Sequence, residues 1–298
     1  MADKTAAMGR LEQYGLKTPV SLVVTKSSGD NLHAFVGAHG HVTSWYLRFN
    51  ERLAPWLPKV VNSPDLLNLV PAVVRTTENL TVIVQERVVA HVSGAMAVRP
   101  DLIFVEYVAG EPVAMLRNGV TPSRILFLPD GKTLCVERNK QEFSCFWKSG
   151  LLKHGFDISL SHLLSEKTRH QLCAAAKKVG SNGIMEWIQM DDGNVVFLDH
   201  RPMSSEFLIG LENLTLGFDA GCYQTLSEDS TRSPSVSHLE RPLYEYAETV
   251  SPNMTSLTFE AGAVLAHACV YATEQGVRCV VSRPKTDNDG ETKVKMKY

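Results

Sequence analysis

The sequence predicts a mixed α/β protein of the α+β kind, with a mostly antiparallel sheet. A helical pattern over residues 3–15 leads directly into a β-rich stretch, which is typical of such proteins. From Leu80 onward, several runs rich in β-branched and aromatic residues follow one another, and short turns that suit hairpins separate them. A well-bounded helix is predicted among these runs, at residues 165–180.

The first elements are a helix over residues 3–15, whose apolar residues gather near one face, and the strand-like run PVSLVVT from Pro19. Residues 37–71 contain two tryptophans and four prolines, which interrupt any sustained period. No element is therefore predicted in that stretch.

Three strand-forming runs follow: LTVIVQERVV from Leu80, DLIFVEYV from Asp101 and RILFLPDGKTLCVE from Arg124. In the last run, Asp130 and Gly131 suit a tight turn between two strands. Consecutive strands joined by short turns predict an antiparallel sheet.

The helix at residues 165–180 has Ser165 as its N-cap and Gly180 as its stop, with two lysines in its last turn. A segment rich in serine and threonine follows residue 210, and we expect it to connect to a second domain. That domain has the pattern of a strand, a turn, a helix and a strand.

Composition limits the function classes. A chain of 298 residues that is 44% hydrophobic can bury a sizeable core in two or three domains. Its net charge of −2 offers no basic field for nucleic acid, and no apolar run approaches the ~20 residues of a membrane span. The N-terminal pattern is not that of a signal peptide. The six cysteines show no CxxC and no zinc-ligand spacing. We expect a cytoplasmic protein that binds neither nucleic acid nor membrane.

Two acids are predicted to face each other in the hairpin IMEWIQMDDGNVVFLDHRP. If Asp192 and Gly193 form a two-residue turn, Glu186 lies opposite Asp199. The other residues expected on their face are mostly apolar: Ile184, Ile188, Met190, Val195, Phe197 and Arg201. Opposing like charges are unfavourable in a sheet, so a cation should lie near them.

That cation can be Arg201, or Mg²⁺, which prefers hard oxygen ligands. A salt-bridged hairpin that binds no ligand is the alternative. A one-residue bulge would change the register.

A histidine begins a short predicted helix in GAVLAHACVYATEQG, residues 262–276. His267 lies between two alanines, and Gly276 is expected to end the helix. One interpretation is a core histidine with satisfied hydrogen bonds. The other is a phosphoryl carrier, because a helix N-terminus offers unpaired N–H groups to a phosphate.

Five ordered stretches resemble the pyruvate phosphate dikinase and phosphoenolpyruvate synthase group, which includes rifampin phosphotransferase. They are DKTAAMGRLEQYGLKTPVSLVVT, VIVQERVVAHVSG, VAGEPVAMLRNGVTP, the pair IMEW and LDHRP, and GAVLAHACVYATEQGVRCVV. The hairpin pair is similar to the family's Asp-Ile-Glu-Trp and Leu-Gln-x-Arg-Pro. The last stretch is similar to its Gly-Gly-x-x-Ser-His motif.

The resemblance implies an ATP-grasp-like nucleotide-binding domain followed by a small swivelling phosphohistidine-like β/α domain. Residues 1–79 would form a shortened N-lobe, residues 80–209 a C-lobe with the metal and phosphate hairpin, and residues 210–298 the swivelling domain. The resemblance further implies that ATP, with Mg²⁺, phosphorylates a histidine on the second domain.

Four residues match nucleotide-binding positions of that family. Lys4 falls on its ATP-contacting lysine and Arg201 on a phosphate-binding arginine, while Glu86 and Val88 lie near its adenine hinge.

Three further residues match the reacting centre. Glu186 falls on a metal-binding glutamate, and Asp199 stands where the family has a glutamine, as a second expected metal ligand. His267 falls on the phosphoryl carrier. The sequence departs from the family at Ile184, which replaces an acid, and at Ala266 and Thr273, which replace a serine and an arginine near the carrier.

The expected ATP lobe is short, since only about 80 residues precede Val82. We expect an ATP-dependent phosphotransferase that passes a phosphoryl group through His267 to a small-molecule or partner acceptor. The alternative is a catalytically degenerate member that acts as a binding or regulatory protein. A third possibility is a one-step ATP-grasp ligase or kinase in which His267 is structural.

Overall fold

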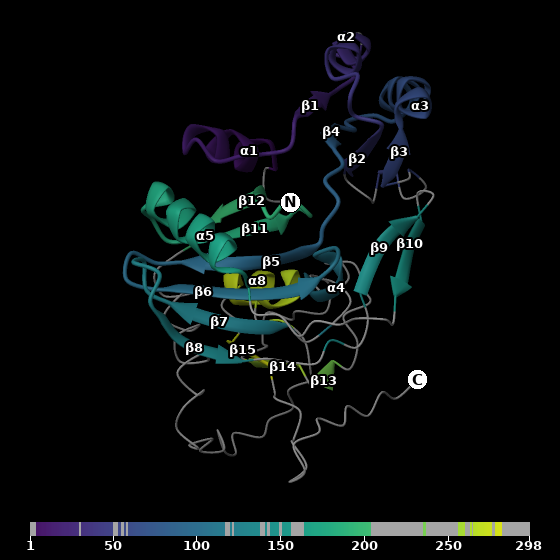
Figure 1. Ribbon diagram of the computed structural model, residues 1–298. Helices are drawn as coiled ribbons and strands as arrows, with labels where there is room; N and C mark the ends of the chain where they lie inside the picture. Colours follow the sequence, from purple (N-terminus) through teal and green to yellow (C-terminus); the bar gives the residue numbers. More distant parts are fainter. Residues whose placement is uncertain are drawn as a thin grey trace.

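The computed structural model is a mixed α/β structure with extensive antiparallel sheet, which confirms the predicted class. Figure 1 shows a large sheet with helices on both of its faces and a smaller sheet with its own two helices beside it. The described residues are 4–29, 31–49, 53–54, 57, 59–116, 120, 122–137, 141, 144–148, 151–155, 164–203, 235–236, 256–259, 263, 265–275 and 278–281.

The smaller sheet has four strands in the order β1-β4-β2-β3, and all its pairs are antiparallel. Helices α2 and α3 cover one face and share a buried apolar core with the strands. The bounds are β1 Ser21–Val24, α2 Asn31–Ala38, β2 Ser44–Phe49, β3 Val60–Asn62, α3 Ser63–Thr76 and β4 Val82–Glu86.

Helix α3 lies in the stretch where the sequence predicts no element. The side chain of Asn62 caps it by accepting the backbone N–H of Asp65 at 2.8 Å, and Pro64 occupies the first turn, where a missing N–H costs nothing. The helix also continues through Pro71. The prolines therefore hide a helix that its tertiary packing and its N-cap support.

The larger sheet has six strands in the order β12-β11-β5-β6-β7-β8, all antiparallel, as the sequence predicts. Its helix α5 is capped as predicted, since Ser165 accepts the Thr168 N–H at 3.1 Å and Gly180 adopts φ 60°. The bounds are α1 Lys4–Gln13, β5 Val92–Val98, β6 Ile103–Ala109, α4 Val113–Leu116, β7 Ser123–Phe127, β8 Thr133–Glu137, α5 Glu166–Val179, β11 Gly183–Gln189 and β12 Val195–Pro202.

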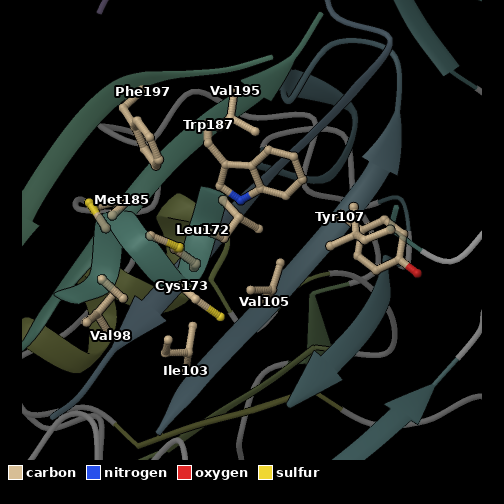
Figure 2. Packing of buried hydrophobic residues seen from close by; sticks show 14 of the residues in the cluster. Val98, Ile103, Val105, Tyr107, Leu172, Cys173, Met185, Trp187, Val195 and Phe197 are labelled. Atoms are coloured by element: carbon tan, nitrogen blue, oxygen red, sulfur yellow. The ribbon is translucent and has the colours of Figure 1, made fainter. Parts of the chain in front are cut away.

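Helix α5 packs on one face of this sheet and completes its main core. Figure 2 shows Leu172 and Cys173 of α5 beside Trp187 of β11 and Val105 of β6. Leu11 of α1 belongs to the same buried cluster. Helix α1 therefore packs with the larger sheet, whereas the resemblance implies that it belongs to the N-lobe.

The β11–β12 hairpin differs from the predicted hairpin at its turn. The Met190 N–H donates to the Asn194 carbonyl at 2.9 Å, so three residues form the loop rather than two. A bulge at Leu198 then shifts the register by one residue. The two differences cancel, and Glu186 lies opposite Asp199 as predicted.

The bulge changes which side chains share a face. Val195 and Phe197, predicted beside Glu186, belong instead to the α5 core together with Met185 and Trp187. This part of the prediction is wrong, because one extra residue reverses the alternation of side chains on β12.

The remaining described elements are a two-stranded hairpin, a three-stranded parallel sheet and helix α8, which lies on the face of the large sheet opposite α5 (Figure 1). Their bounds are β9 Ser144–Lys148, β10 Leu151–Gly155, β13 Ser235–Val236, β14 Ser256–Phe259, α8 His267–Glu274 and β15 Arg278–Val281. Helix α8 begins at His267, as predicted, whereas Gly276 lies outside the described residues. Within the described ranges, no helix has the length and apolar character needed to cross a membrane.

The strand pairing joins residues on both sides of the boundary predicted at residue 79. Strand β4, placed after the boundary at residue 79, pairs between β1 and β2 of the smaller sheet. The chain passes from the smaller to the larger sheet through residues 87–91. The second predicted boundary, near residue 210, lies outside the described residues.

Candidate functional site

A row of mostly charged residues crosses the large sheet on the face that α8 covers. From β12 to β7 the directly paired positions are Asp199, Glu186, Ala95, Glu106 and Arg124. Directly paired residues of neighbouring strands project from the same face. Three carboxylates therefore lie on one side of a sheet whose other side is an apolar core.

Glu106 is the most buried acid in this row, with a relative exposure of 0%. One of its oxygens accepts the Arg124 Nε–H at 2.9 Å, and the other accepts the backbone N–H of Leu265 at 2.7 Å. A fully buried carboxylate requires such charge-assisted partners. The sequence did not single out Glu106 or Arg124, because neither lies in a recognisable motif.

Glu186 contacts the predicted phosphoryl carrier. His267 Nε2 lies 2.9 Å from Glu186 Oε1, and the two side chains are only 25% and 15% exposed. The structure thus brings together two residues that the sequence proposes separately, 81 positions apart. Their partial burial keeps the contact in a region of reduced dielectric.

Asp199 contacts the smaller sheet. Its Oδ2 lies 3.7 Å from Nη1 of Arg48 on β2. Arg48 projects from the face of the small sheet opposite Trp45 and Leu47, which point into that sheet's own core. Sequence reasoning missed Arg48, although the alternation in SWYLRF was the signal that could have found it.

Arg201 pairs with the far end of α8. Its Nη1 lies 3.3 Å from Glu274 Oε2, and both side chains are about one-third exposed. The sequence offered Arg201 either as a phosphate ligand or as the neutraliser of the two acids. Arg48 and His267 contact those acids, and Arg201 contacts Glu274.

The other predicted nucleotide contacts lie near the connection between the sheets or on α1. Glu86 ends β4, where its backbone N–H donates to the Val20 carbonyl at 2.8 Å. Val88 is half-buried within the connection at residues 87–91, and Lys4 is the first residue of α1. Beside Glu86, Gln85 is only 2% exposed, and its Nε2 has no hydrogen-bond partner among the described residues. Sequence reasoning missed Gln85.

A second buried acid lies close to this connection. Glu111, in the Gly-Glu loop after β6, is 8% exposed, and burial raises its pKa to about 7. Arg87 opposes this rise by its positive charge. Gly110 holds the loop in place with φ 79°, since a Cβ there would lie 2.7 Å from the Cys145 carbonyl oxygen.

The carboxylates on this face meet the minimum requirement for Mg²⁺, which often binds one or two carboxylates together with substrate phosphates and water. Glu186 and Asp199 occupy directly paired positions. Among the residues that the structure describes, no group of three or more histidine, cysteine, aspartate and glutamate side chains is placed to hold a metal. Any Mg²⁺ here would need phosphate oxygens to complete its coordination.

Comparisons with known proteins identify no family. No family model matches the sequence, and no curated protein matches it. Among solved structures, the chain resembles the ATP-grasp ligase PsnB complexed with minimal precursor, Mg and ADP at 16% identity and TM-score 0.34, covering 67% of this chain and 50% of that one.

Two other solved structures are similar to a comparable degree. The macrocyclase MdnC from Microcystis aeruginosa MRC, bound with the precursor peptide MdnA, matches at 14% identity and TM-score 0.38, covering 70% of this chain and 55% of that one. The VanG D-Ala:D-Ser ligase from Enterococcus faecalis matches at 13% identity and TM-score 0.36, covering 67% and 52%. The chain thus spans about half the length of these structures.

Proposed function

We propose that this protein is an ATP-dependent phosphotransferase of the dikinase type, in which His267 carries a phosphoryl group from ATP to a small-molecule or partner acceptor. The single observation that best supports this is the 2.9 Å contact between His267 Nε2 and Glu186 Oε1. The candidate carrier therefore contacts the carboxylate that we propose as a metal ligand.

Under this proposal, nucleotide phosphates bind between the facing surfaces of the two sheets. Arg48 and Arg201 supply guanidinium groups, which suit phosphate because they donate in a planar fork. Lys4, Glu86 and Val88 contact other parts of ATP. Residues 1–79, 80–209 and 210–298 correspond to the two lobes of an ATP-grasp-like domain and to a swivelling phosphohistidine-like domain.

Mg²⁺ would be held by Glu186 and Asp199, and it would neutralise phosphate charge during transfer. Both carboxylates must then exchange a protein partner for the metal. The His267 ring would be released from Glu186 at the place where the phosphates arrive.

A His267 ring nitrogen forms a bond to the β-phosphorus of ATP while the bond from that phosphorus to the AMP oxygen breaks. Water hydrolyses the bond between the β- and γ-phosphates, which releases inorganic phosphate. The β-phosphoryl group then passes from the imidazole to the acceptor, and a donor nearby must stabilise its charge.

A second candidate is a nucleotide-binding or regulatory protein without turnover. It is favoured by the observation that Glu186 contacts the His267 ring and Asp199 contacts the Arg48 guanidinium, so that both carboxylates have a protein partner where the metal would bind. A one-step ligase or kinase with a structural His267 is the third.

Product analysis separates these candidates. The protein is incubated with Mg²⁺ and ATP, and the nucleotide products are resolved by ion-exchange chromatography. AMP with inorganic phosphate supports the phosphohistidine route. ADP would indicate the one-step route, and binding without turnover would indicate the regulatory protein.

A further inference from the structure

We infer that Glu106 is the positioning residue that anchors the His267 segment to the large sheet. This inference rests on the proposed role of His267. Glu106 accepts the backbone N–H of Leu265, two residues before His267, at 2.7 Å. Because the donor is a backbone group, the contact fixes the path of the chain directly before α8.

The Glu106 side chain is held firmly within the large sheet. Glu106 lies on β6, inside the six-stranded sheet, and its second oxygen accepts from Arg124 of the neighbouring strand β7 at 2.9 Å. Arg124 is itself only 6% exposed. A carboxylate held between a buried guanidinium and a buried N–H has little freedom to rotate.

The segment that it holds is closely packed. Ala263, Leu265 and Ala266 are at most 1% exposed, and Cys269 is 2% exposed. The Ala266 N–H donates to the Ala263 carbonyl at 3.2 Å, which forms the turn that leads into α8. The Glu106 contact and the Glu186 contact therefore lie two residues apart on one short segment, and together they set both the position and the orientation of the His267 ring.

The Glu106→Gln variant tests the anchor, because the amide keeps the size of the side chain and supplies one acceptor oxygen in place of two. Arg124 and the Leu265 N–H must then compete for it, which leaves a buried donor unsatisfied. We expect α8 to leave the sheet more often. The exposed pair Arg201–Glu274 holds the other end of the same helix, so Glu274→Gln serves as the matched control.

Two native cysteines can report whether α8 leaves the sheet. Cys269 lies on α8, whereas Cys173 lies on α5, on the opposite face of the sheet; both are buried, and neither forms a disulfide. We propose to label the native protein with N-ethylmaleimide and to quantify each site by mass spectrometry. In Glu106→Gln, labelling of Cys269 should accelerate by about tenfold or more, as expected for a lost charge-assisted hydrogen bond. Cys173 should not change, and Glu274→Gln should leave both rates near those of the parent.

An unchanged Cys269 rate would overturn the inference. Equal acceleration at Cys269 and Cys173 would also overturn it, because Glu106 would then stabilise the whole sheet. Should Glu106→Gln fail to fold, the double variant Glu106→Gln/Arg124→Leu removes the competition between Arg124 and the Leu265 N–H for the amide oxygen. It should protect Cys269 nearly as well as the parent does, and rapid labelling of Cys269 alongside a protected Cys173 would contradict the anchor.

Phosphorylation of His267 is measured separately. If ATP carrying a labelled β-phosphate modifies the parent, the label should decrease in Glu106→Gln and recover in the double variant. If the parent takes no label, the proposed function fails, while the cysteine rates still decide whether Glu106 anchors α8.

Discussion

Glu186 and Asp199 occupy directly paired positions on β11 and β12, yet each contacts a basic residue from a different part of the chain. His267 reaches Glu186 from α8, and Arg48 reaches Asp199 from the small sheet. This pair of acids is therefore the meeting point of three structural units.

Replacing Glu186 with glutamine should abolish Mg²⁺-dependent ATP binding and leave the fold intact, because the amide keeps the size and removes the charge. For the parent, ATP at a hundred times its Kd should stabilise the folded state by about 2.7 kcal/mol and raise the Tm. The variant should show no such rise in differential scanning calorimetry. Glu166→Gln, at an exposed position on α5, is the control. An undiminished Tm shift in Glu186→Gln would show that the metal assignment is wrong.

Replacing Arg201 with lysine should weaken ATP binding by about tenfold, equivalent to one charge-assisted hydrogen bond. Lysine keeps the charge but cannot present the planar fork. The exposed pair with Glu274 contributes little, so the free energy of unfolding should change by less than ~0.5 kcal/mol. Titration calorimetry measures the affinity. Equal ATP affinities in the parent and the variant would show that Arg201 contacts Glu274 and not the nucleotide phosphates.

Replacing His267 with asparagine should remove an acid-labile, alkali-stable phosphoryl label. The label is supplied as ATP carrying a labelled β-phosphate, together with Mg²⁺, and is counted on the isolated protein. His170→Asn, which alters an exposed histidine on α5, should keep the label. Label that survives in His267→Asn, or a parent that takes none, would remove His267 from the reaction.

Glu111 should make the protein less stable as the pH rises. Burial raises its pKa from 4.5 to about 7 in the folded state, so the folded protein binds the extra proton between these values. The stabilisation is complete below pH 4.5 and is lost as the pH rises through 7, an effect of at most about 3 kcal/mol. Glu111→Gln cannot lose this proton. Relative to the parent, its free energy of unfolding should therefore rise by about 2–3 kcal/mol between pH 5 and pH 8 in urea titrations. A constant difference would contradict the assignment.

Replacing Gly94 with alanine should destabilise the larger sheet by about 3 kcal/mol or more, because overpacking of a core forces side chains and backbone apart. A Cβ at Gly94 would collide with the Glu106 carbonyl oxygen and lie 2.8 Å from the Trp187 ring. Gly37→Ala, in helix α2, meets no atom within 4 Å and should be neutral or stabilising. Chemical denaturation compares the two variants. Similar stabilities would mean that β5 and β11 can separate at low cost.

Local signals in the sequence predict several elements well. Helix α5 has both its caps in its own sequence, so Ser165 and Gly180 mark its bounds without any knowledge of its neighbours. The pairing of Glu186 with Asp199 is predicted correctly only because the longer loop and the bulge at Leu198 compensate each other. Register near a turn therefore depends on backbone details that the sequence pattern leaves open.

The residues that the sequence does not reveal are those with distant partners. Glu106 stands in a strand pattern that gives no indication of its Leu265 partner, 159 residues away. Arg48 lies in a short strand for which the sequence predicts no element, and its contact with Asp199 depends on how two sheets meet. His267 is recognisable as the start of a helix, whereas its contact with Glu186 is a result of tertiary packing.

The distance along the chain between Glu106 and Leu265 has a consequence for folding. Strands β5, β6 and β7 leave the ribosome long before α8 is synthesised, and contacts of large sequence separation are slow to form. Until α8 docks, the nascent large sheet therefore carries three carboxylates on an uncovered face. Helix α5 is synthesised earlier and is already available to cover the other face. Docking of α8 becomes a late step of maturation, and chains that stall before it would expose a charged, incompletely covered surface to chaperones and proteases.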